Sequence, residues 1–274
     1  MKIGIIGTGN MGTIMIESLI EASVVQPTQL FITNRTMSKT EPLKSAYPLL
    51  QIVHDARVVV KCSDIIFTCV KPVQIEPLLE NIKDVLSPNH ILISITSPVS
   101  VHQLEATIDC KVARIIPSIT NRALSGASLF SFGKRLSNKD KRQLLALFGE
   151  ISTPIQIEEN ITRVASDISS CGPAFLSYLL EEMINGAVEK TPISREQATY
   201  IMTEMAIGFG KLLEQDIYSL ATLKEKVRVQ GGVTGVGLDV LEKQIGGKFT
   251  MLYEATEQKF KEDHSLIDPH FPSI

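Results

Sequence analysis

The amino-acid sequence predicts an α/β protein in which a parallel sheet with crossover helices comes first and an all-helical domain follows. Up to about residue 155, short β-branched runs alternate with amphipathic stretches, as they do where helices connect the strands of a parallel sheet. Most of these runs are nearly all apolar, which is typical of strands buried on both faces. After about Asn160 the strand-like runs stop, and long stretches carry apolar residues at helical spacing.

Each expected element follows from its local pattern. The apolar runs predict strands at Lys2–Ile6, Leu30–Thr33, Ile65–Cys69, Ile91–Ile95 and Val112–Ile116. Helical spacing predicts helices at Met11–Ala22, Gln74–Leu86 and Lys139–Phe148, and later at Ala174–Glu189, Ser194–Glu214, Thr234–Gln244 and Lys248–Asp263. We therefore expect a sheet domain at 1–158 and a helical domain at 159–274.

The composition allows two globular domains and excludes some partners. The chain has 274 residues, of which 44% are hydrophobic, enough for a full core. Lys and Arg number 27 against 30 Asp and Glu, and the resulting net charge of -3 gives no electrostatic reason to bind nucleic acid or an anionic membrane. No stretch reaches the ~18 uncharged apolar residues of a membrane helix. Small-molecule chemistry is therefore the default.

Cysteines and histidines show no metal or disulfide pattern. Cys62, Cys69, Cys110 and Cys171 match neither a metal knuckle nor a disulfide framework, and the histidines form no HExxH-type pair. The apolar N-terminus carries Asn10 and lacks a signal-peptide cleavage pattern. We expect no metal, and a reduced protein in the cytoplasm.

The stretch Ala174–Val188 carries apolar residues over a wider face than a surface helix needs. Because the helical domain is small, a partner subunit is the expected source of burial. We expect a homodimer through this domain, with stacking of dimers as a further option. The tail after His264, with Pro269 and Pro272, is expected to fray.

Gly7-Thr8-Gly9-Asn10-Met11-Gly12 is a GxGxxG run that directly follows an expected strand and opens an expected helix. In a dinucleotide site, Gly7 would make the tight turn, Gly9 would let the backbone approach a pyrophosphate, and Gly12 would let helix and strand pack closely. The helix N-terminus would offer N–H groups to the phosphates. A purely structural turn is the weaker alternative. The fold class is thus a Rossmann-type parallel sheet followed by helices.

Asn34, Arg35 and Thr36 follow the second expected strand, where an NAD site would carry a carboxylate for the ribose hydroxyl. A carboxylate would repel a 2′-phosphate, whereas Arg35 can pair with it bidentately. NADP is therefore favoured over NAD. The alternative is that Arg35 is an ordinary surface arginine.

Gly7–Gly12, Asn34–Thr36 and Val70-Lys71-Pro72 together resemble the cofactor half of pyrroline-5-carboxylate reductase. In the second half, Ser169–Phe175 resembles that family's small-residue segment ending in Gly-Pro-Ala-aromatic, and Gln230–Thr234 with Leu238 resembles its C-terminal signature. Order and spacing match to about Lys261. Within the family, the chain looks most like the ComER branch of late competence operons.

The resemblance implies a Rossmann domain that holds NADPH, a helical dimerisation domain, and a substrate site between the two. The implied reaction is hydride transfer from the nicotinamide to the imine carbon of 1-pyrroline-5-carboxylate, an imino acid, giving proline. The chain would then be an NADP-dependent oxidoreductase acting on a C=N bond. The residues expected to bind the cofactor are Gly7, Thr8, Gly9, Asn10, Met11, Gly12, Asn34, Arg35, Thr36, Val70, Lys71 and Pro72.

Backbone N–H groups of Gly231, Gly232 and Val233 form an expected nest for the substrate carboxylate, with the Thr234 hydroxyl as a further donor. A glycine pair is also a common way to begin a helix, and only the resemblance favours the functional interpretation. Thr234 and Glu181 are the residues expected to be catalytic. Glu181 matches a glutamate of the family's long helix and would act as a proton carrier or as an orienting acceptor. Lys71 either meets the nicotinamide ribose or is a solvated lysine.

Several residues depart from the family's pattern. Ile116-Pro117-Ser118-Ile119-Thr120 stands where the family usually has Met-Pro-Asn-Thr-Pro. Val229-Gln230 replaces Ser-Pro before the glycine pair, and Ser170-Cys171 replaces Gly-Ser before Gly172. The fold and cofactor binding should survive these changes, whereas substrate orientation is expected to weaken.

Three functions remain open from the sequence. The first is a pyrroline-5-carboxylate reductase, with weakened activity. The alternative is a ComER-like regulatory protein that keeps the fold and nucleotide binding with little or no activity. A β-hydroxyacid dehydrogenase ranks last, because no lysine falls between Arg163 and Lys190 to act as its general base.

Overall fold

The computed structural model describes residues 1–271, which form two compact units. Residues 1–173 and the segment from Ala255 onward form the sheet unit, and Ala174–Glu254 form the helical unit. No helix within residues 1–271 is long and apolar enough to cross a membrane.

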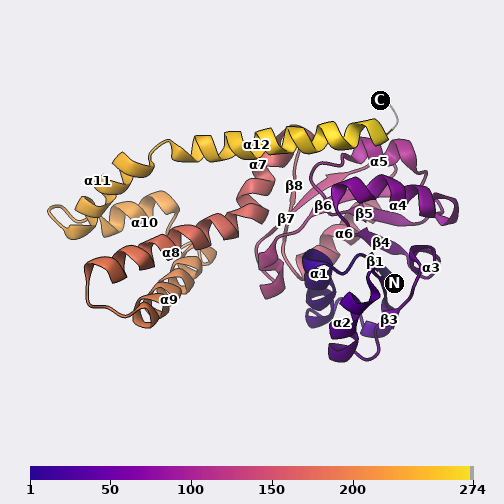
Figure 1. Ribbon diagram of the computed structural model, residues 1–274, viewed down its shortest axis with the longest axis horizontal. Coiled ribbons are helices and arrows are strands. Elements are labelled where there is room, and N and C mark those ends of the chain that lie inside the picture. Colours follow the sequence, from indigo (N-terminus) through magenta and orange to yellow (C-terminus); the bar gives the residue numbers. More distant parts are fainter. Residues whose placement is uncertain (272–274) are drawn as a thin grey trace. The chain divides into compact units, whose positions relative to one another are not determined.

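The sheet unit is built on one eight-stranded sheet in the order β3-β2-β1-β4-β5-β6-β7-β8 (Figure 1). All neighbouring strands are parallel except the antiparallel pair β6 and β7. The strands are β1 Ile3–Ile6, β2 Leu30–Thr33, β3 Gln51–Ile52, β4 Ile65–Thr68, β5 Ile91–Ser94, β6 Lys111–Ile116, β7 Ala127–Phe132 and β8 Thr153–Gln156. The predicted α/β class with a parallel sheet is confirmed.

Side-chain alternation along the strands builds one apolar layer on each face of the sheet. Ile3 and Ile5 face a layer that includes α1 and α6, whereas Ile6 faces a layer that includes α3, α4 and α5. The helices of this unit are α1 Asn10–Glu21, α2 Glu41–Ala46, α3 Ala56–Lys61, α4 Ile75–Ile82, α5 Val101–Thr107, α6 Asn138–Gly149 and α7 Thr162–Ser166. A π-helix, Asp167–Cys171, follows α7.

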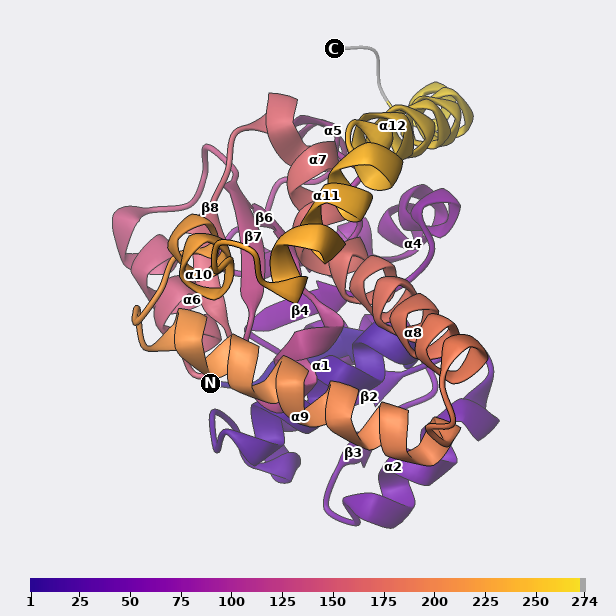
Figure 2. The same cartoon turned by 90° about the vertical axis from the view of Figure 1, so that its left-hand side faces the viewer.

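The helical unit consists of α8 Gly172–Lys190 from Ala174 onward, α9 Arg195–Glu214, α10 Leu220–Val227, α11 Val233–Ile245 and the start of α12 Lys248–Ile267 (Figure 2). Serine side chains begin α9 and α10: Ser194 and Ser219 accept hydrogen bonds from backbone N–H groups of the first turn. Ile184 and Ala198 are the buried hydrophobic residues among 174–254. Many large apolar side chains of this unit, Leu176, Met183 and Tyr200 among them, are thus left exposed.

The end of the chain is ordered as far as residue 271, so the expectation of fraying after His264 is wrong. Helix α12 continues to Ile267, and Ile267 and Phe271 join the apolar layer beside α5. The side-chain amide of Gln103 donates to Asp268 at 2.8 Å. The buried side chains of Ile267 and Phe271 and this hydrogen bond therefore hold the segment that the prolines led us to expect to fray. Pro272 lies outside the described residues.

Candidate functional site

The three glycines of the first loop each meet a different backbone requirement. Gly7 has φ 103° and donates to Thr33 O at 2.9 Å, and a Cβ there would lie 2.4 Å from Cys69 O. A Cβ on Gly12 would lie 2.0 Å from Gly7 O, so helix α1 packs directly on the turn. A Cβ on Gly9 would meet nothing within 4 Å. The open space is therefore at Gly9 alone, where a pyrophosphate would approach.

The rest of this loop presents donors without partners. Gly9 is the N-cap of α1 and has no side chain to bind the first N–H groups, which belong to Asn10, Met11 and Gly12. The first turn of α1 contains no acidic residue. The Thr8 hydroxyl is buried and has no hydrogen-bond partner within residues 1–271. Such a set of donors suits an anion.

The loop after β2 is ordered by Asn34, whose side-chain amide donates to Thr36 O at 2.9 Å. Arg35 and Thr36 are exposed. Arg35 forms no ion pair with any residue of the described chain. Its guanidinium is therefore available to a ligand.

The loop after β4 contains Val70, Lys71 and Pro72. Val70 is half-buried, and Pro72 begins a short 3-10 turn, Pro72–Gln74. The Lys71 N–H donates to Gln74 Oε1 at 3.3 Å, while the Lys71 side chain is exposed. Burial raises the pKa of the neighbouring Cys69 thiol to about 12, which leaves it protonated and unsuited to act as a nucleophile.

Sheet register brings these three loops to one edge. Ile6 of β1 pairs with Thr33 of β2 and with Thr68 of β4, so Gly7, Asn34 and Cys69 begin their loops side by side. The chain order reverses between β1 and β4, since β2 and β3 lie on one side and β5 to β8 on the other. Ligands of such sheets bind at this switch point, outside the carboxyl ends of the strands.

In the helical unit, the glycine pair forms a tight turn at the start of α11. Gly231 has φ 73°, and the Gly232 N–H donates to Val229 O at 2.9 Å. Gly232 is the N-cap of α11, Val233 is exposed and Thr234 is half-buried. The Gly232 N–H is thus already used, which reduces the expected nest to the N–H groups of Gly231 and Val233 with the Thr234 hydroxyl.

Glu181 is exposed on α8 and lines a cavity of about 540 Å³ between α8 and α9. Thr203 is another polar residue of its wall, and Leu180 and Ile184 are among its apolar residues. Thr234 does not belong to the wall of this cavity. The structure therefore does not bring the two residues expected to be catalytic into one cavity of the helical unit.

The chain matches known proteins along almost its whole length. Residues 159–263 match the family described as pyrroline-5-carboxylate reductase dimerisation, and residues 2–98 match the family described as NADP oxidoreductase coenzyme F420-dependent. ComE operon protein 4 of Bacillus subtilis is 48% identical over 99% of both chains. Pyrroline-5-carboxylate reductase 3 of the same organism is 28% identical over 95% of this chain and 96% of that protein. The chain belongs to the pyrroline-5-carboxylate reductase family.

The fold agrees with this family. The crystal structure of Plasmodium falciparum pyrroline carboxylate reductase with NADP bound has a TM-score of 0.83 at 24% identity, covering 97% of this chain and 98% of that one. The enzyme of Coxiella burnetii gives the same TM-score at 22% identity and the same coverage. The predicted resemblance to the ComER branch is confirmed by the match to ComE operon protein 4.

The departure at Ser118 has a structural role. Ser118 is fully buried, and its hydroxyl donates to Ser169 O at 2.7 Å in the π-helix. The same oxygen accepts from the hydroxyl of Thr120 at 3.0 Å, and Ser170 donates to Pro117 O at 2.9 Å. The serine that replaces the family's asparagine thus ties two loops together instead of presenting a free donor.

Two arginines near this π-helix, the buried Arg114 and the half-buried Arg163, were not expected from the sequence. Arg114 pairs with Glu159 at 2.7 Å and donates to Thr162 Oγ1 at 2.6 Å. Burial lowers the pKa of Arg114, and the charge of Glu159 opposes that change. Arg163 pairs with Asp167 at 2.7 Å. Their partners lie up to 48 residues away in the chain, so spacing gave no signal for the Arg114 network.

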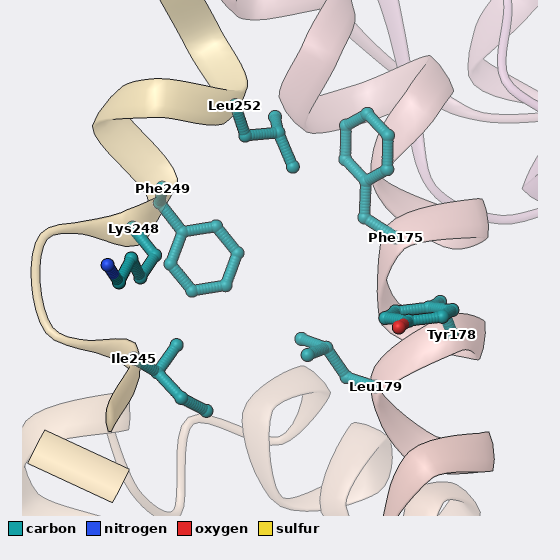
Figure 3. A pocket seen from close by; sticks show the side chains of 7 residues that line it. All are labelled: Phe175, Tyr178, Leu179, Ile245, Lys248, Phe249 and Leu252. Atoms are coloured by element: carbon teal, nitrogen blue, oxygen red, sulfur yellow. The ribbon is translucent and has the colours of Figure 1, made fainter. Parts of the chain in front are cut away.

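A second cavity of the helical unit is lined mainly by apolar side chains, with Tyr178 and Lys248 as its residues that carry polar groups. It measures about 240 Å³ and lies between α8 and the start of α12. Figure 3 shows Phe175 on one side and Phe249 and Leu252 on the other, directed into the same space. Tyr178 of its lining is also one of the exposed large side chains of this unit.

Proposed function

We propose that the chain is an NADPH-dependent reductase of the cyclic imine 1-pyrroline-5-carboxylate, with proline as product and with weakened turnover. The observation that carries the proposal is the loop Gly7–Gly12. A Cβ at Gly7 or Gly12 would collide with the protein backbone, whereas a Cβ at Gly9 would face open space. Beside this open position lies the hydroxyl of Thr8, which is buried and has no hydrogen-bond partner within residues 1–271, as expected where a ligand would supply the partner.

The residues at this edge of the sheet fit a phosphorylated dinucleotide. The N–H groups at the start of α1 and the Thr8 hydroxyl would hold the pyrophosphate. The exposed, unpaired Arg35 would bind the 2′-phosphate, and the turn at Val70–Pro72 would border the nicotinamide ribose. The bound cofactor would supply the hydride.

The helical unit would hold the substrate. N–H groups of Gly231 and Val233 and the field of the α11 N-terminus would bind the carboxylate, and the Thr234 hydroxyl would give a proton or hydrogen bond to the ring nitrogen. Glu181 is proposed to orient the substrate or relay a proton. The main work of the chain is to hold the reacting carbons about 3–3.5 Å apart.

Turnover is expected to be weak because the 116–120 loop offers no free amide. The hydroxyl of Ser118 is already committed to Ser169 O. Losing one orienting hydrogen bond costs about 1–3 kcal/mol, so two losses would lower the rate by roughly two to four decades. Such a chain would bind NADPH well and reduce the imine slowly.

We further propose that the working form is a homodimer in the cytoplasm. The match to a dimerisation family and the uncovered apolar surface of the helical unit support the dimer. All four cysteines are free thiols, which supports a reducing compartment.

The experiment measures NADPH binding and NADPH oxidation with 1-pyrroline-5-carboxylate in parallel. We expect tight NADPH binding, and turnover far below the tens per second that are typical of enzymes. The Thr234→Ala variant should lose the remaining turnover without changing NADPH affinity. NADPH binding with no turnover at any enzyme concentration would favour the regulatory alternative, to which the match to ComE operon protein 4 gives its support. Failure to bind NADPH would contradict both.

A further inference from the structure

An ion pair joins the two ends of the loop that carries the glycine pair. Arg228 caps the end of α10, where its N–H donates to Lys224 O at 3.1 Å. Its guanidinium donates from Nη2 to Asp239 Oδ1, on α11, at 2.9 Å. Residues 229–232 lie between these two points in the chain. The side chain of Arg228 therefore spans the loop from its first residue to the helix that follows it.

The absence of a side chain at Gly235 lets Arg228 lie close to α11. A Cβ on Gly235 would lie 3.8 Å from Arg228 Nε and 3.9 Å from Arg228 Cγ, so the arginine rests on the first turn of the helix. Asp239 follows Gly235 by one turn and shares its face. Gly235 thus leaves room for the side chain of Arg228, and the carboxylate of Asp239 accepts its hydrogen bond.

The loop's other hydrogen bonds do not reach α11 beyond its start. Val229 N donates to Val227 O at 3.0 Å, and Gly232 N donates to Val229 O at 2.9 Å. These bonds shape residues 227–232 internally. The turn is already continuous with α11 through Gly232, its N-cap, and the ion pair adds a side-chain link from Arg228 to the next turn of the helix.

We propose that Arg228 and Asp239 are positioning residues that hold the Gly231–Gly232 turn against α11 for binding of the substrate carboxylate. The inference rests on the proposed function. It deepens that function by naming residues that act through the turn without touching the ligand. A turn held in its binding geometry before the ligand arrives loses less conformational freedom on binding.

The experiment titrates the full-length protein with L-proline, the proposed product, in the presence of NADP+, and follows binding by calorimetry. The pair is exposed, so Asp239→Asn should weaken proline affinity about two- to five-fold. The effect should fade in about 0.5 M salt because screening weakens exposed ion pairs. The matched control is Asp263→Asn, which removes the exposed Lys259–Asp263 pair of α12 and should leave the affinity unchanged.

A double exchange, Arg228→Asp with Asp239→Arg, separates positioning from direct contact. Restored affinity in this variant supports the proposal, because the pair is kept while the guanidinium changes place. Lost affinity in the double exchange, with affinity kept in Asp239→Asn, would mean that Arg228 itself binds the carboxylate, which overturns the positioning role. An unchanged affinity in Asp239→Asn also overturns the inference and leaves the proposed function standing. Absence of proline binding by the unmodified protein, even with NADP+ bound, overturns both.

Discussion

Gly9 and Gly12 lie three residues apart in one loop, yet their α-carbons face different surroundings. At Gly12 a side chain would collide with Gly7 O, whereas at Gly9 it would point into open space. A collision inside the chain affects folding, and a collision with a ligand affects binding. The two residues therefore allow folding and cofactor binding to be tested independently in the same loop.

Gly12→Ala should destabilise the protein by about 1–3 kcal/mol, because overpacking at a close backbone contact strains the fold. Gly9→Ala should leave the free energy of unfolding nearly unchanged, since Gly9 has φ -76°, and should weaken NADPH binding at least ten-fold. Denaturant unfolding and fluorescence titration with NADPH measure the two effects. If Gly9→Ala and the unmodified protein bind NADPH with equal affinity, the pyrophosphate does not bind at Gly9.

Arg35→Asp should abolish the preference for NADPH over NADH. A charge-assisted hydrogen bond is worth about 1.5–3 kcal/mol, so NADPH affinity should fall about ten- to a hundred-fold. NADH affinity should hold or rise, because aspartate can accept from the ribose hydroxyl. Arg142→Asp, a change of the same charge at an exposed arginine of α6, is the control. If the unmodified protein binds both nucleotides equally, Arg35 has no part in selectivity.

At the scale of elements, Asp140 connects helix α6 to strand β6. Asp140 Oδ2 accepts from Ser137 N at 2.9 Å in the capping box, and Asp140 Oδ1 accepts from Lys111 Nζ at 2.8 Å. Partial burial raises the pKa of this carboxyl, but the hydrogen bonds from Lys111 and Ser137 outweigh it, and the pKa lies below its ordinary value of 3.8.

This lowered pKa predicts a loss of stability in acid. Because the folded state lowers the pKa, the contribution of Asp140 is complete at neutral pH and disappears as the pH falls below 3.8. Asp140→Asn should cost about 1–3 kcal/mol at pH 7, and the difference from the unmodified protein should shrink below that value. Unfolding by denaturant between about pH 2.5 and 7 measures it. Asp109→Asn, at a fully exposed position, should show no such change.

The elements that can be predicted from the sequence are those whose burial shows as a continuous local run of apolar residues. All the expected strands lie within one residue of observed ones, because their apolar runs are buried on both faces. Strands β3, β7 and β8 escape prediction for separate reasons. β3 has only two residues, β7 has two serines that interrupt its apolar residues, and β8 is an edge strand with Pro154. Helix α10 is short and lies in a polar stretch.

The candidate site divides in the same way. The glycine loop could be predicted from the sequence, because only glycine fits where a Cβ would collide with the backbone, as at Gly7 and Gly12. The hydrogen bond from Ser118 to Ser169 and the ion pair of Arg114 with Glu159 join residues 51 and 45 positions apart. No periodicity marks such partners, so the commitment of the Ser118 hydroxyl could not be foreseen.

At the scale of the whole molecule, the apolar surface is unevenly distributed between the two units. The sheet unit buries two continuous apolar layers. In the helical unit, Leu176, Met183 and Tyr200 are among many large apolar side chains that remain more than half exposed. So many exposed large apolar side chains indicate an interface, and the matched dimerisation family points to a second copy as its cover.

We therefore expect a stable dimer at low micromolar concentration in sedimentation experiments. Leu176→Asp should shift the protein to monomers or aggregates, because a carboxylate would be buried in the interface without a partner. Leu49→Asp is the matched control: Leu49 is 62% exposed and Leu176 53% exposed, but Leu49 belongs to the sheet unit. If exposure alone governed assembly, both variants would behave alike. If the helical unit forms the interface, only Leu176→Asp loses the dimer, and a monomeric unmodified protein would contradict that arrangement.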